Sequence, residues 1–412
     1  MTGMVLRLAM RNLARHKRRT TIVAAGIAIG VAAAVVHGGL AAGIRHQMID
    51  HLIISRFGHV TVSPDFSDAP DEGAQPMISD PARIAQAIQE AIPRAQITPF
   101  LSTLGMAFGE RAGTARVALN AIIPELEPAL MNDLTQRAGG EPLQLAEGSV
   151  WLGGALAERL ECGRGGIVTL GIFTSDGALD VADFEVAQVF GPGAPWQDYF
   201  VYMRLEDLQR LLGVGRAVGS LRLRLASGLD GAAAAVELLR PVLAGMDPAL
   251  RAEPFDEAGQ LFMGIIKAIR IQAGVVEATL LVAIALTVAG AQIVSVHERR
   301  REIGMMAALG TMRGSILTVF LVEGAVLALA AGSIGAVIGA GVTALLGATG
   351  LALDAEAFRW MVGAPTVVPR IEFVRVLATL AGLVLTVTVA GLTPALRASR
   401  LLPVEALKAG PA

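Results

Sequence analysis

One run of charged and apolar residues, from His297 to Gly310, has a composition and spacing that suit a specific task. It reads HERRREIGMMAALG and lies between two apolar stretches that are each long enough to cross a bilayer. On a helix from about Arg301, four residues share one face at spacings of three and four: Ile303, Met306, Ala307 and Gly310. A methionine-bearing face adapts to a groove on a partner protein, and Gly310 ends the helix. The run therefore predicts a docking helix; the alternative is an interfacial helix held on anionic lipid by its arginines.

The chain offers little for catalysis or metal binding. It contains no G-x-x-x-x-G-K-[ST] phosphate loop, no H-E-x-x-H pair, no G-x-S-x-G elbow and no cysteine–histidine metal spacing. None of its three lysines, Lys17, Lys267 and Lys408, follows a glycine loop. We therefore expect no catalytic residue, metal or cofactor on this chain. Nucleic-acid binding is not expected either, because the basic clusters abut apolar spans, where membrane topology explains them.

One acidic residue, Glu323, lies about two turns inside the third apolar stretch. A charge within a membrane helix is costly unless it has a partner. A basic residue of the loop or the tail, or a neighbouring subunit, could supply that partner. We expect Glu323 to anchor the docking run structurally rather than to contact a substrate.

The elements that hold these residues are membrane helices. Hydrophobic residues make up 53% of the chain and charged residues 17%, against about 25% charged in a soluble domain. Four stretches reach the length of about 20 residues that a bilayer core requires: Thr21–Leu40, Gly274–Val296, Ile316–Leu346 and Val374–Leu392. The third is longer than spanning needs, so we expect it to tilt or to end in a turn outside the membrane.

Charge predicts how these spans are oriented. The first 20 residues hold six bases and no acid, the loop after the second span holds four arginines, and the tail holds Arg397, Arg400 and Lys408. With four spans these segments lie on one side, which the positive-inside rule makes cytoplasmic. Residues 45–270 hold 28 acids and 18 bases and would lie outside as an acidic domain.

The exported segment is predicted to be a mixed α+β domain. Alternating residues predict strands and helical spacing predicts helices. The expected strands are His59–Ser63, Arg116–Ile123, Ile167–Ile172, Phe184–Phe190, Asp198–Met203 and Ser220–Ala226. The expected helices are Asp80–Ile92, Val150–Leu160, Leu205–Leu212 and Gly231–Leu243, with Asp-Gly closing the turn after Ile172. The fold class is thus a membrane α-helical protein with four transmembrane helices and a large extracytoplasmic α+β domain.

The boundaries follow from these assignments. We expect a basic cytoplasmic N-terminus (1–20), a first span (21–44), an extracytoplasmic domain (45–255), a stalk with the second span (256–296), a cytoplasmic coupling loop (297–315), a third span (316–347), a short outer loop (348–372), a fourth span (373–393) and a cytoplasmic tail (394–412).

Three motifs in this order resemble the FtsX-like permeases of ABC transporters, a group that includes MacB-type exporters and lipoprotein-releasing permeases. The opening Arg11-Asn12-Leu13 with its basic turn is similar to the start of that family. The stretch from Glu298 through Arg301-Glu302-Ile303 to Ala308-Leu309-Gly310, then Leu321 to Gly324, is similar to its E-x-x-R-E-I-x-x-x-x-A-L-G…L-x-E-G pattern. The ending, from Pro394-Ala395 to Pro403 and Ala406-Leu407, resembles its tail.

The resemblance implies a coupling helix that sits on a cytoplasmic ATPase. By position, the coupling residues would be Arg301, Glu302, Ile303, Gly304, Met306, Leu309 and Gly310. The implied partners are an ABC ATPase dimer that binds ATP and Mg²⁺, and a second permease, identical or homologous. The implied location is the bacterial inner membrane, with the large domain in the periplasm.

Two functions remain open from the sequence. The first is a transporter subunit that extracts or exports lipoprotein or another amphiphile, within the lipid membrane. The second is a non-transporting transmitter that activates a cell-wall hydrolase outside. The size of the exported domain favours the first. One departure is that the turn Thr174–Asp180 is short where the carrier-recruiting relatives have a long hairpin.

Overall fold

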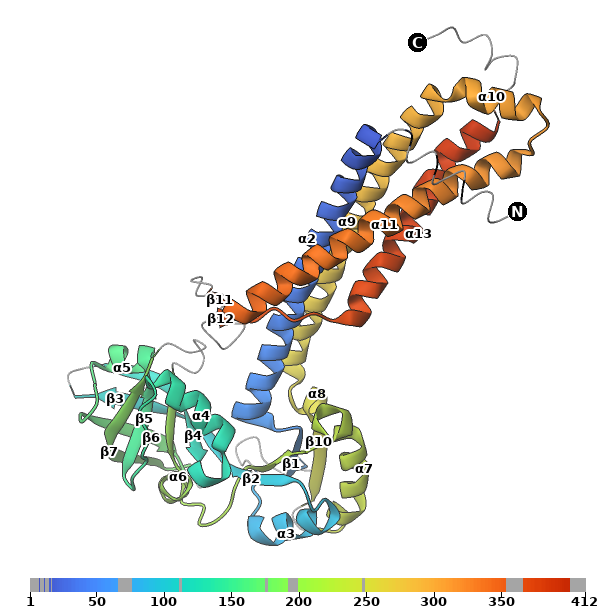
Figure 1. Cartoon of the computed structure of the whole chain (residues 1–412). Helices are drawn as coiled ribbons and strands as arrows, with labels where there is room; N and C mark the ends of the chain where they lie inside the picture. Colours follow the sequence, from blue (N-terminus) through green and yellow to red (C-terminus); the bar gives the residue numbers. More distant parts are fainter. Residues whose placement is uncertain are drawn as a thin grey trace. The chain divides into compact units, whose positions relative to one another are not determined.

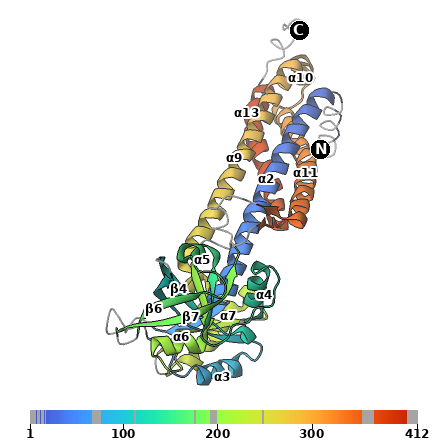
Figure 2. The same cartoon turned by 90° about the vertical axis from the view of Figure 1, so that its left-hand side faces the viewer.

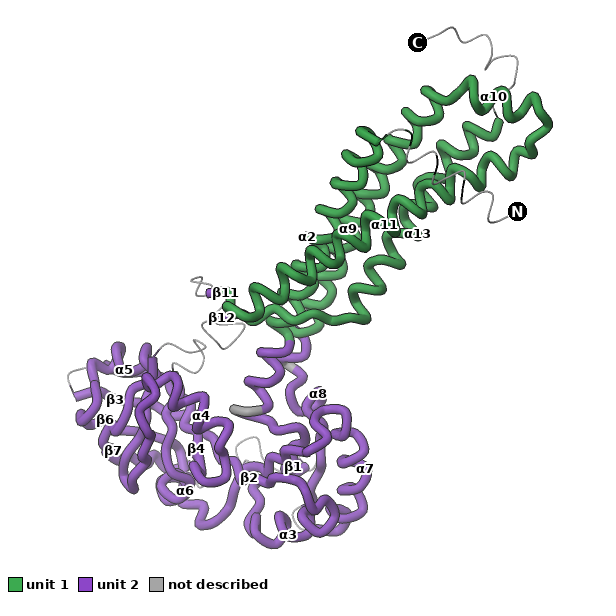
Figure 3. Tube along the Cα trace, viewed as in Figure 1, with its two compact units in different colours: residues 1–45, 266–351, 367–412 green, residues 46–265, 352–366 purple. Residues whose placement is uncertain are grey.

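The computed structural model describes residues 7, 11, 15, 17–65, 76–110, 113–174, 177–191, 199–246, 249–352 and 366–400. They fall into two compact units (Figure 3). Unit 1 comprises residues 1–45, 266–351 and 367–412, and unit 2 comprises residues 46–265 and 352–366. Two long helices pass from one unit to the other, and each unit is described by itself.

Unit 1 is a helix bundle (Figure 1). Four of the described helices are long and apolar enough to cross a membrane. They are α2 (Lys17–Leu52), α9 (Gln260–Glu298), α11 (Arg313–Thr349) and α13 (Phe373–Ser399). The four predicted spans lie within them. α11 is one unbroken helix of 37 residues, so the third apolar run has no turn inside it.

The bundle is held by apolar packing and by close helix contacts. Its core includes Ile27, Val31, Ile284, Leu383 and Val387, which have little or no exposed surface. Small residues let the backbones approach each other, as expected between membrane helices. Gly43 lies against the backbone of Val368 and Gly335 against that of Ala28, so that a Cβ at either glycine would overlap backbone atoms.

Unit 2 contains a four-stranded antiparallel sheet covered by two helices. The strands β1 (Val60–Pro64), β2 (Gln96–Phe100), β9 (Ser220–Arg224) and β10 (Leu250–Pro254) lie in the order β10-β1-β9-β2. α3 (Pro81–Ala91) connects β1 to β2, and α7 (Ala232–Leu243) connects β9 to β10. These two strand–helix–strand units form a split βαβ arrangement. Asp80 caps α3 by accepting from the Arg83 N–H.

A closed barrel is inserted between β2 and β9. Its strands are β3 (Ser102–Gly109), β4 (Thr114–Ile122), β5 (Ser149–Gly153), β6 (Ile167–Phe173), β7 (Leu179–Phe190) and β8 (Phe200–Arg204), in the order β3-β4-β8-β5-β7-β6. The helices α4 (Pro128–Arg137), α5 (Gly154–Leu160) and α6 (Leu205–Leu212) pack around it. Figure 2 shows β6 and β7 running side by side along its wall.

Short elements account for the remaining helical turns and strands of the described residues. They are a π-helical turn η1 (Ile53–Phe57), the 3-10 turns η3 (Pro124–Leu126) and η4 (Gly228–Gly231), α8 (Phe255–Ala258), α10 (Arg300–Ala308), β11 (Leu351–Ala352) and β12 (Thr366–Val367).

The predicted fold class of four membrane helices with a mixed α+β domain is confirmed. One element was wrong: Val150–Leu160 is strand β5 followed by α5 rather than a single helix. All of Ser149–Gly153 is buried between neighbouring strands, so its apolar run shows no alternation to separate it from a helix. Residues 175, 176 and 198, Asn12, Leu13 and the tail from Leu401 lie outside the described residues.

One buried ion pair ties the sheet to the helical side of the barrel within unit 2. Arg222 on β9 pairs with Glu127 at the start of α4, and both side chains are almost fully enclosed. The Arg222 guanidinium also lies 4.1 Å from the ring centre of Phe100. Burial raises the pKa of Glu127 and lowers that of Arg222, and their mutual attraction opposes both shifts.

Candidate functional site

The predicted docking run forms a short helix with a well-defined end. α10 covers Arg300–Ala308 between α9 and α11. Gly310 adopts a φ of 85°, and its N–H donates to the Ala307 carbonyl while the Thr311 N–H donates to the Met306 carbonyl. These two bonds make a Schellman cap, which favours glycine at the left-handed position. The predicted stop at Gly310 is therefore confirmed.

The face that the sequence analysis assigned to docking points into the bundle. Ile303 has no exposed surface and Gly304 is buried. Ile303 belongs to a cluster with Val296, Ile316, Phe320, Ala395 and Ala398, and Met306 and Ala307 pack against that cluster. The apolar spacing was identified correctly, and Ile303 is covered within the chain, whereas Met306 and Ala307 are partly exposed and Gly310 is exposed. Ile303 anchors α10 to α11 and α13. The contact of this face with a partner stays a prediction.

The apolar side chains that remain exposed lie elsewhere on α10 and just beyond it. Met305 is 48% exposed, Leu309 87% and Met312 77%. Arg301 is also exposed. We call Met305, Leu309 and Met312 the docking surface. Large apolar side chains exposed together at a helix–turn are typical of a protein-binding surface.

Arg299 connects the three helices that meet at this end. Its side chain is 8% exposed, and its Nε donates to Glu302 at 3.2 Å. Its Nη1 donates to Glu323 of α11 at 3.3 Å. The guanidinium also lies 5.5 Å from the Phe320 ring centre. The partner that the sequence left open for Glu323 is thus Arg299, and sequence reasoning had not singled this arginine out.

The basic residues at the start of the chain also reach this site. Arg15 pairs with Glu302 at 2.9 Å, and Arg19 pairs with Glu298 at 2.9 Å. Arg19 also donates to the Ala291 carbonyl of α9. The positive charge that predicted a cytoplasmic N-terminus is therefore partly neutralised by Glu298, which precedes α10, and by Glu302 in its first turn. We call this set of ion pairs, with Arg299–Glu323, the α10-end network.

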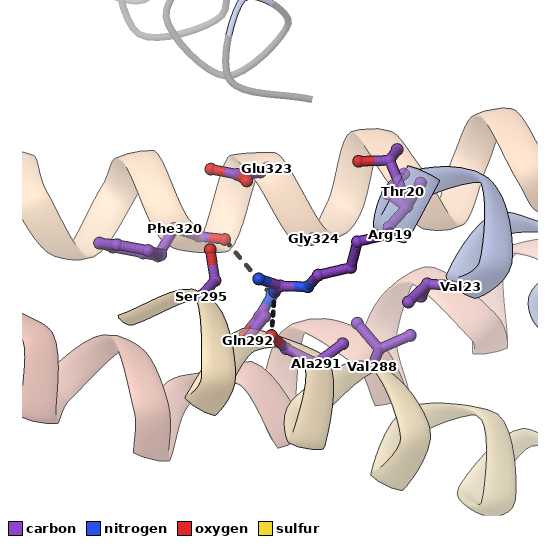
Figure 4. A pocket seen from close by; sticks show the side chains of 11 residues that line it. Arg19, Thr20, Val23, Val288, Ala291, Gln292, Ser295, Phe320, Glu323 and Gly324 are labelled. Carbon is purple, nitrogen blue, oxygen red and sulfur yellow. Dashed lines mark hydrogen bonds between the residues drawn. The ribbon is translucent and has the colours of Figure 1, made fainter. Parts of the chain in front are cut away.

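A small pocket of about 40 Å³ lies beside this network (Figure 4). Arg19, Gln292, Ser295, Phe320 and Glu323 contribute to its walls. The Gln292 Nε2 donates to the Phe320 carbonyl at 3.5 Å, whereas its buried Oε1 has no hydrogen-bond partner among the described residues. A space of this size, with the polar side chains of Arg19, Gln292 and Glu323 in its walls, can hold a water molecule.

A second set of ion pairs lies at the other end of the bundle. Arg375 of α13 donates to Glu277 of α9 at 3.1 and 3.3 Å, and Thr379 donates to the same carboxylate. Arg45 of α2 pairs with Glu372, the residue before α13. We call these pairs the Arg45-end network.

The described residues contain no group of three or more His, Cys, Asp or Glu side chains arranged to hold a metal ion. What the α10 end offers is an anchored helix, an exposed apolar surface and a set of ion pairs that join α2, α9, α10 and α11. Among the described residues, this arrangement provides no nucleophile–base pair. Sequence reasoning did not identify Arg15 and Arg19 as the partners of these acids. Glu298 and Glu302 lie four residues apart in a basic loop, and this spacing was the signal in the sequence from which ion pairs with basic residues could have been predicted.

Two family models match the chain. The MacB-like periplasmic core domain matches residues 20–240, and the FtsX-like permease C-terminal domain matches residues 275–403.

Curated relatives agree with these matches. The macrolide export ATP-binding/permease protein MacB of Chlorobaculum tepidum is 39% identical over 28% of this chain and 16% of its own length. The uncharacterized ABC transporter permease YknZ of Bacillus subtilis is 39% identical over 28% of this chain and 25% of its own length. The MacB protein of Burkholderia thailandensis is 24% identical over 97% of this chain and 59% of its own length. The chain thus spans less than two thirds of each of these relatives.

A solved structure, the periplasmic region of MacB from Actinobacillus actinomycetemcomitans, matches 52% of this chain and 97% of that chain. The identity is 16% and the TM-score 0.32, so the family assignment does not depend on it.

Proposed function

Because the chain belongs to the FtsX/MacB-type family of ABC transporter permeases, we propose that it couples ATP hydrolysis on a separate subunit to movements of its extracytoplasmic domain. The family implies a partnering ATPase and usually a second permease.

The observation that carries the proposal is the construction of α10. Its inner side is fixed by Ile303, and its outer side presents Leu309, which is 87% exposed. An ATPase that bound the docking surface would therefore move a helix already packed against α11 and α13. Arg299 would pass the same displacement to Glu323 through their ion pair.

The coupling residues then divide into two roles. Leu309, with Met305 and Met312, would contact the ATPase, and exposed Arg301 would lie beside them. The second role is to hold α10 on the bundle, and it would fall to Ile303, Gly304 and Met306. Glu302 would link α10 to Arg15 and Arg299. Gly310 would end the helix.

We place the α10 end in the cytoplasm of a bacterial inner membrane. The excess of arginine and lysine in the first 20 residues, the loop and the tail supports this orientation. The acidic segment 45–270 would then be periplasmic. ATP and Mg²⁺ would bind the partner ATPase dimer.

For the cargo we propose an amphiphile, with lipoprotein first and another lipid or a drug second. Relatives named for macrolide export support the export of an amphiphilic molecule. The alternative is a transmitter that activates a periplasmic cell-wall hydrolase; the large exported domain favours transport over this alternative.

The test compares Leu309→Ser with Leu229→Ser in the full chain. Leu229 is an exposed leucine of η4 in unit 2 and serves as the matched control. Tagged chains are purified in mild detergent from native membranes, and the ATPase bound per permease is measured. We expect Leu309→Ser to lower this ratio about tenfold, as loss of a central interface side chain does, and Leu229→Ser to leave it unchanged. Equal ratios would place the ATPase contact elsewhere.

The same preparations separate the two functions. Bound lipoprotein or other amphiphile supports transport, whereas a co-purified cell-wall hydrolase supports the transmitter. Absence of any ATPase from the wild-type preparation would refute the coupling proposal.

A further inference from the structure

One wall of the barrel in unit 2 carries an unusual apolar surface. β3, β6 and β7 are adjacent antiparallel strands, and their register places Met106 opposite Gly171 and Gly171 opposite Val181. The next row towards the β6–β7 turn pairs Phe173 with Leu179. Side chains alternate along a strand, so these residues share the outer face while Val168, Leu170 and Ile172 fill the interior.

Six large apolar side chains that solvent reaches surround the Gly171 row of the outer face, and Ile167, which is 49% exposed, lies further along β6. Leu104 is 80% exposed, Phe173 69% and Leu179 62%. We define the barrel patch by its members: Leu104, Met106, Phe108, Phe173, Leu179 and Val181. Six neighbouring side chains exposed to this degree offer on the order of 500 Å² of apolar surface, near the upper end for a monomer. This surface is distinct from the α10 docking surface.

The patch changes character along the strands. One row from its centre, the register places Asp183 opposite Thr169, and two rows from its centre it places Glu185 opposite Ile167. Glu110 lies there as well, because its carboxylate accepts the Ile167 N–H at 3.1 Å. All three acids are exposed, whereas Arg116, opposite Met106, is the one exposed base paired directly with a patch residue in the described register. The wall thus carries apolar side chains in the described rows nearest the β6–β7 turn and the three acids at its other end.

We propose that the barrel patch binds a second protein whose contact surface is apolar and flanked by lysine or arginine. Stable interfaces bury about 800 Å² on each partner, so an apolar centre of this size with a charged rim fits one side of such an interface. The acidic end selects a basic partner, because like charges repel and opposite charges attract across an interface.

The charges on the wall favour this partner over two other occupants, which are a second copy of the barrel and an anionic bilayer surface. A second copy of the barrel would bring three acids towards three acids, and Arg164, which lies near Glu185, is already paired with Glu141. An anionic bilayer surface would repel the same acids. A basic, amphipathic protein surface satisfies both the apolar rows and the acidic end.

The test uses photo-cross-linking in the full chain in its native membranes. A photoreactive amino acid is placed at Leu104 or Phe173, and at Leu238 as a control. Leu238 is 58% exposed on α7 and lies outside the patch. Adducts are separated by mass, and the cross-linked peptide is sequenced. We expect both patch positions to give a protein adduct about fivefold above Leu238, with a peptide that carries apolar and basic residues.

A paired variant tests the charge requirement. Asp183→Asn with Glu185→Gln keeps the shape of the wall and removes two charges, so the adduct should fall by roughly threefold. Raising the salt concentration should lower the wild-type adduct in the same direction. An adduct to the same chain, an adduct to lipid alone, a peptide without basic residues, or yields equal to those of Leu238 would each overturn the proposal. An adduct unaffected by both the variant and salt would do the same.

Discussion

The two ends of the helix bundle use the same chemistry in different settings. At the α10 end, Arg15 is 70% exposed and its partner Glu302 39%. At the Arg45 end, no side chain of the two arginine–glutamate pairs described is more than 28% exposed. Exposed ion pairs are screened and exchange partners readily, whereas enclosed pairs hold one geometry. The outer pairs of the α10 end, made by Arg15 and Arg19, can therefore rearrange, whereas the enclosed Arg299–Glu323 pair and both pairs of the Arg45 end hold the helices in one arrangement.

α9 contributes to both networks and sets their separation. Glu277 and Glu298 lie 21 residues apart on this helix (298 − 277), which corresponds to about 31 Å at 1.5 Å per residue. A bilayer core is about 30 Å thick. The two networks are therefore spaced to lie near the two faces of a membrane, where charged side chains are least costly.

The largest loss of stability is expected at the Arg45 end. Glu277→Gln keeps the side-chain shape but leaves Arg375 without its countercharge, which should cost roughly 3–5 kcal/mol of stability. Thermal unfolding of the purified chain measures this loss. The double variant Glu277→Gln with Arg375→Gln should recover part of it. A loss within about 1 kcal/mol, typical of an exposed pair, would remove the distinction between the two ends.

The next effect tests whether α9 carries movement beyond the Arg45 end. Ile265 lies inside α9, and a proline there should cost about 3 kcal/mol by removing a helix hydrogen bond and clashing with the preceding turn. We expect Ile265→Pro to leave ATP hydrolysis by the assembled complex in place while abolishing the extracytoplasmic output. Ile265→Ala serves as the control. Unchanged coupling in the proline variant would show that α9 is not the mechanical route.

Arg299 should show an intermediate effect. Arg299→Met keeps much of the packing against Phe320 but leaves Glu323 without the charge that pairs with it. We expect a loss of about 1–3 kcal/mol, the usual cost of an unsatisfied buried polar group. Arg299→Lys retains a charge without the planar fork and should lose less. Unfolding measured on both variants distinguishes charge from geometry, and equal losses would mean that packing alone matters.

The smallest effect is expected at Arg15. Its pair with Glu302 is exposed, so Arg15→Ala should cost at most about 1 kcal/mol, and that cost should shrink at high salt. Thermal unfolding at low and high salt checks both statements. A large, salt-independent loss would show that the α10-end network is as rigid as the Arg45-end network.

Several features of the site were accessible from the sequence for physical reasons. Gly310 follows a helical run, and only glycine readily adopts the φ of 85° found there. Glu323 required a partner because an isolated charge in a membrane helix is costly. β5 was misassigned because a fully buried strand has the same apolar composition as a buried helix.

The sequence by itself determined the four membrane helices, the exported α+β domain and the position of α10, because length, hydropathy and charge are local properties of the chain. Only the tertiary structure decided which side of α10 is covered, since periodicity tells which residues share a face but not what packs on it. It also decided that Arg15 reaches Glu302 across 287 positions of sequence, and that Leu104 and Phe173 share one wall of a barrel. Such contacts depend on how distant segments pair, and no local pattern encodes that pairing.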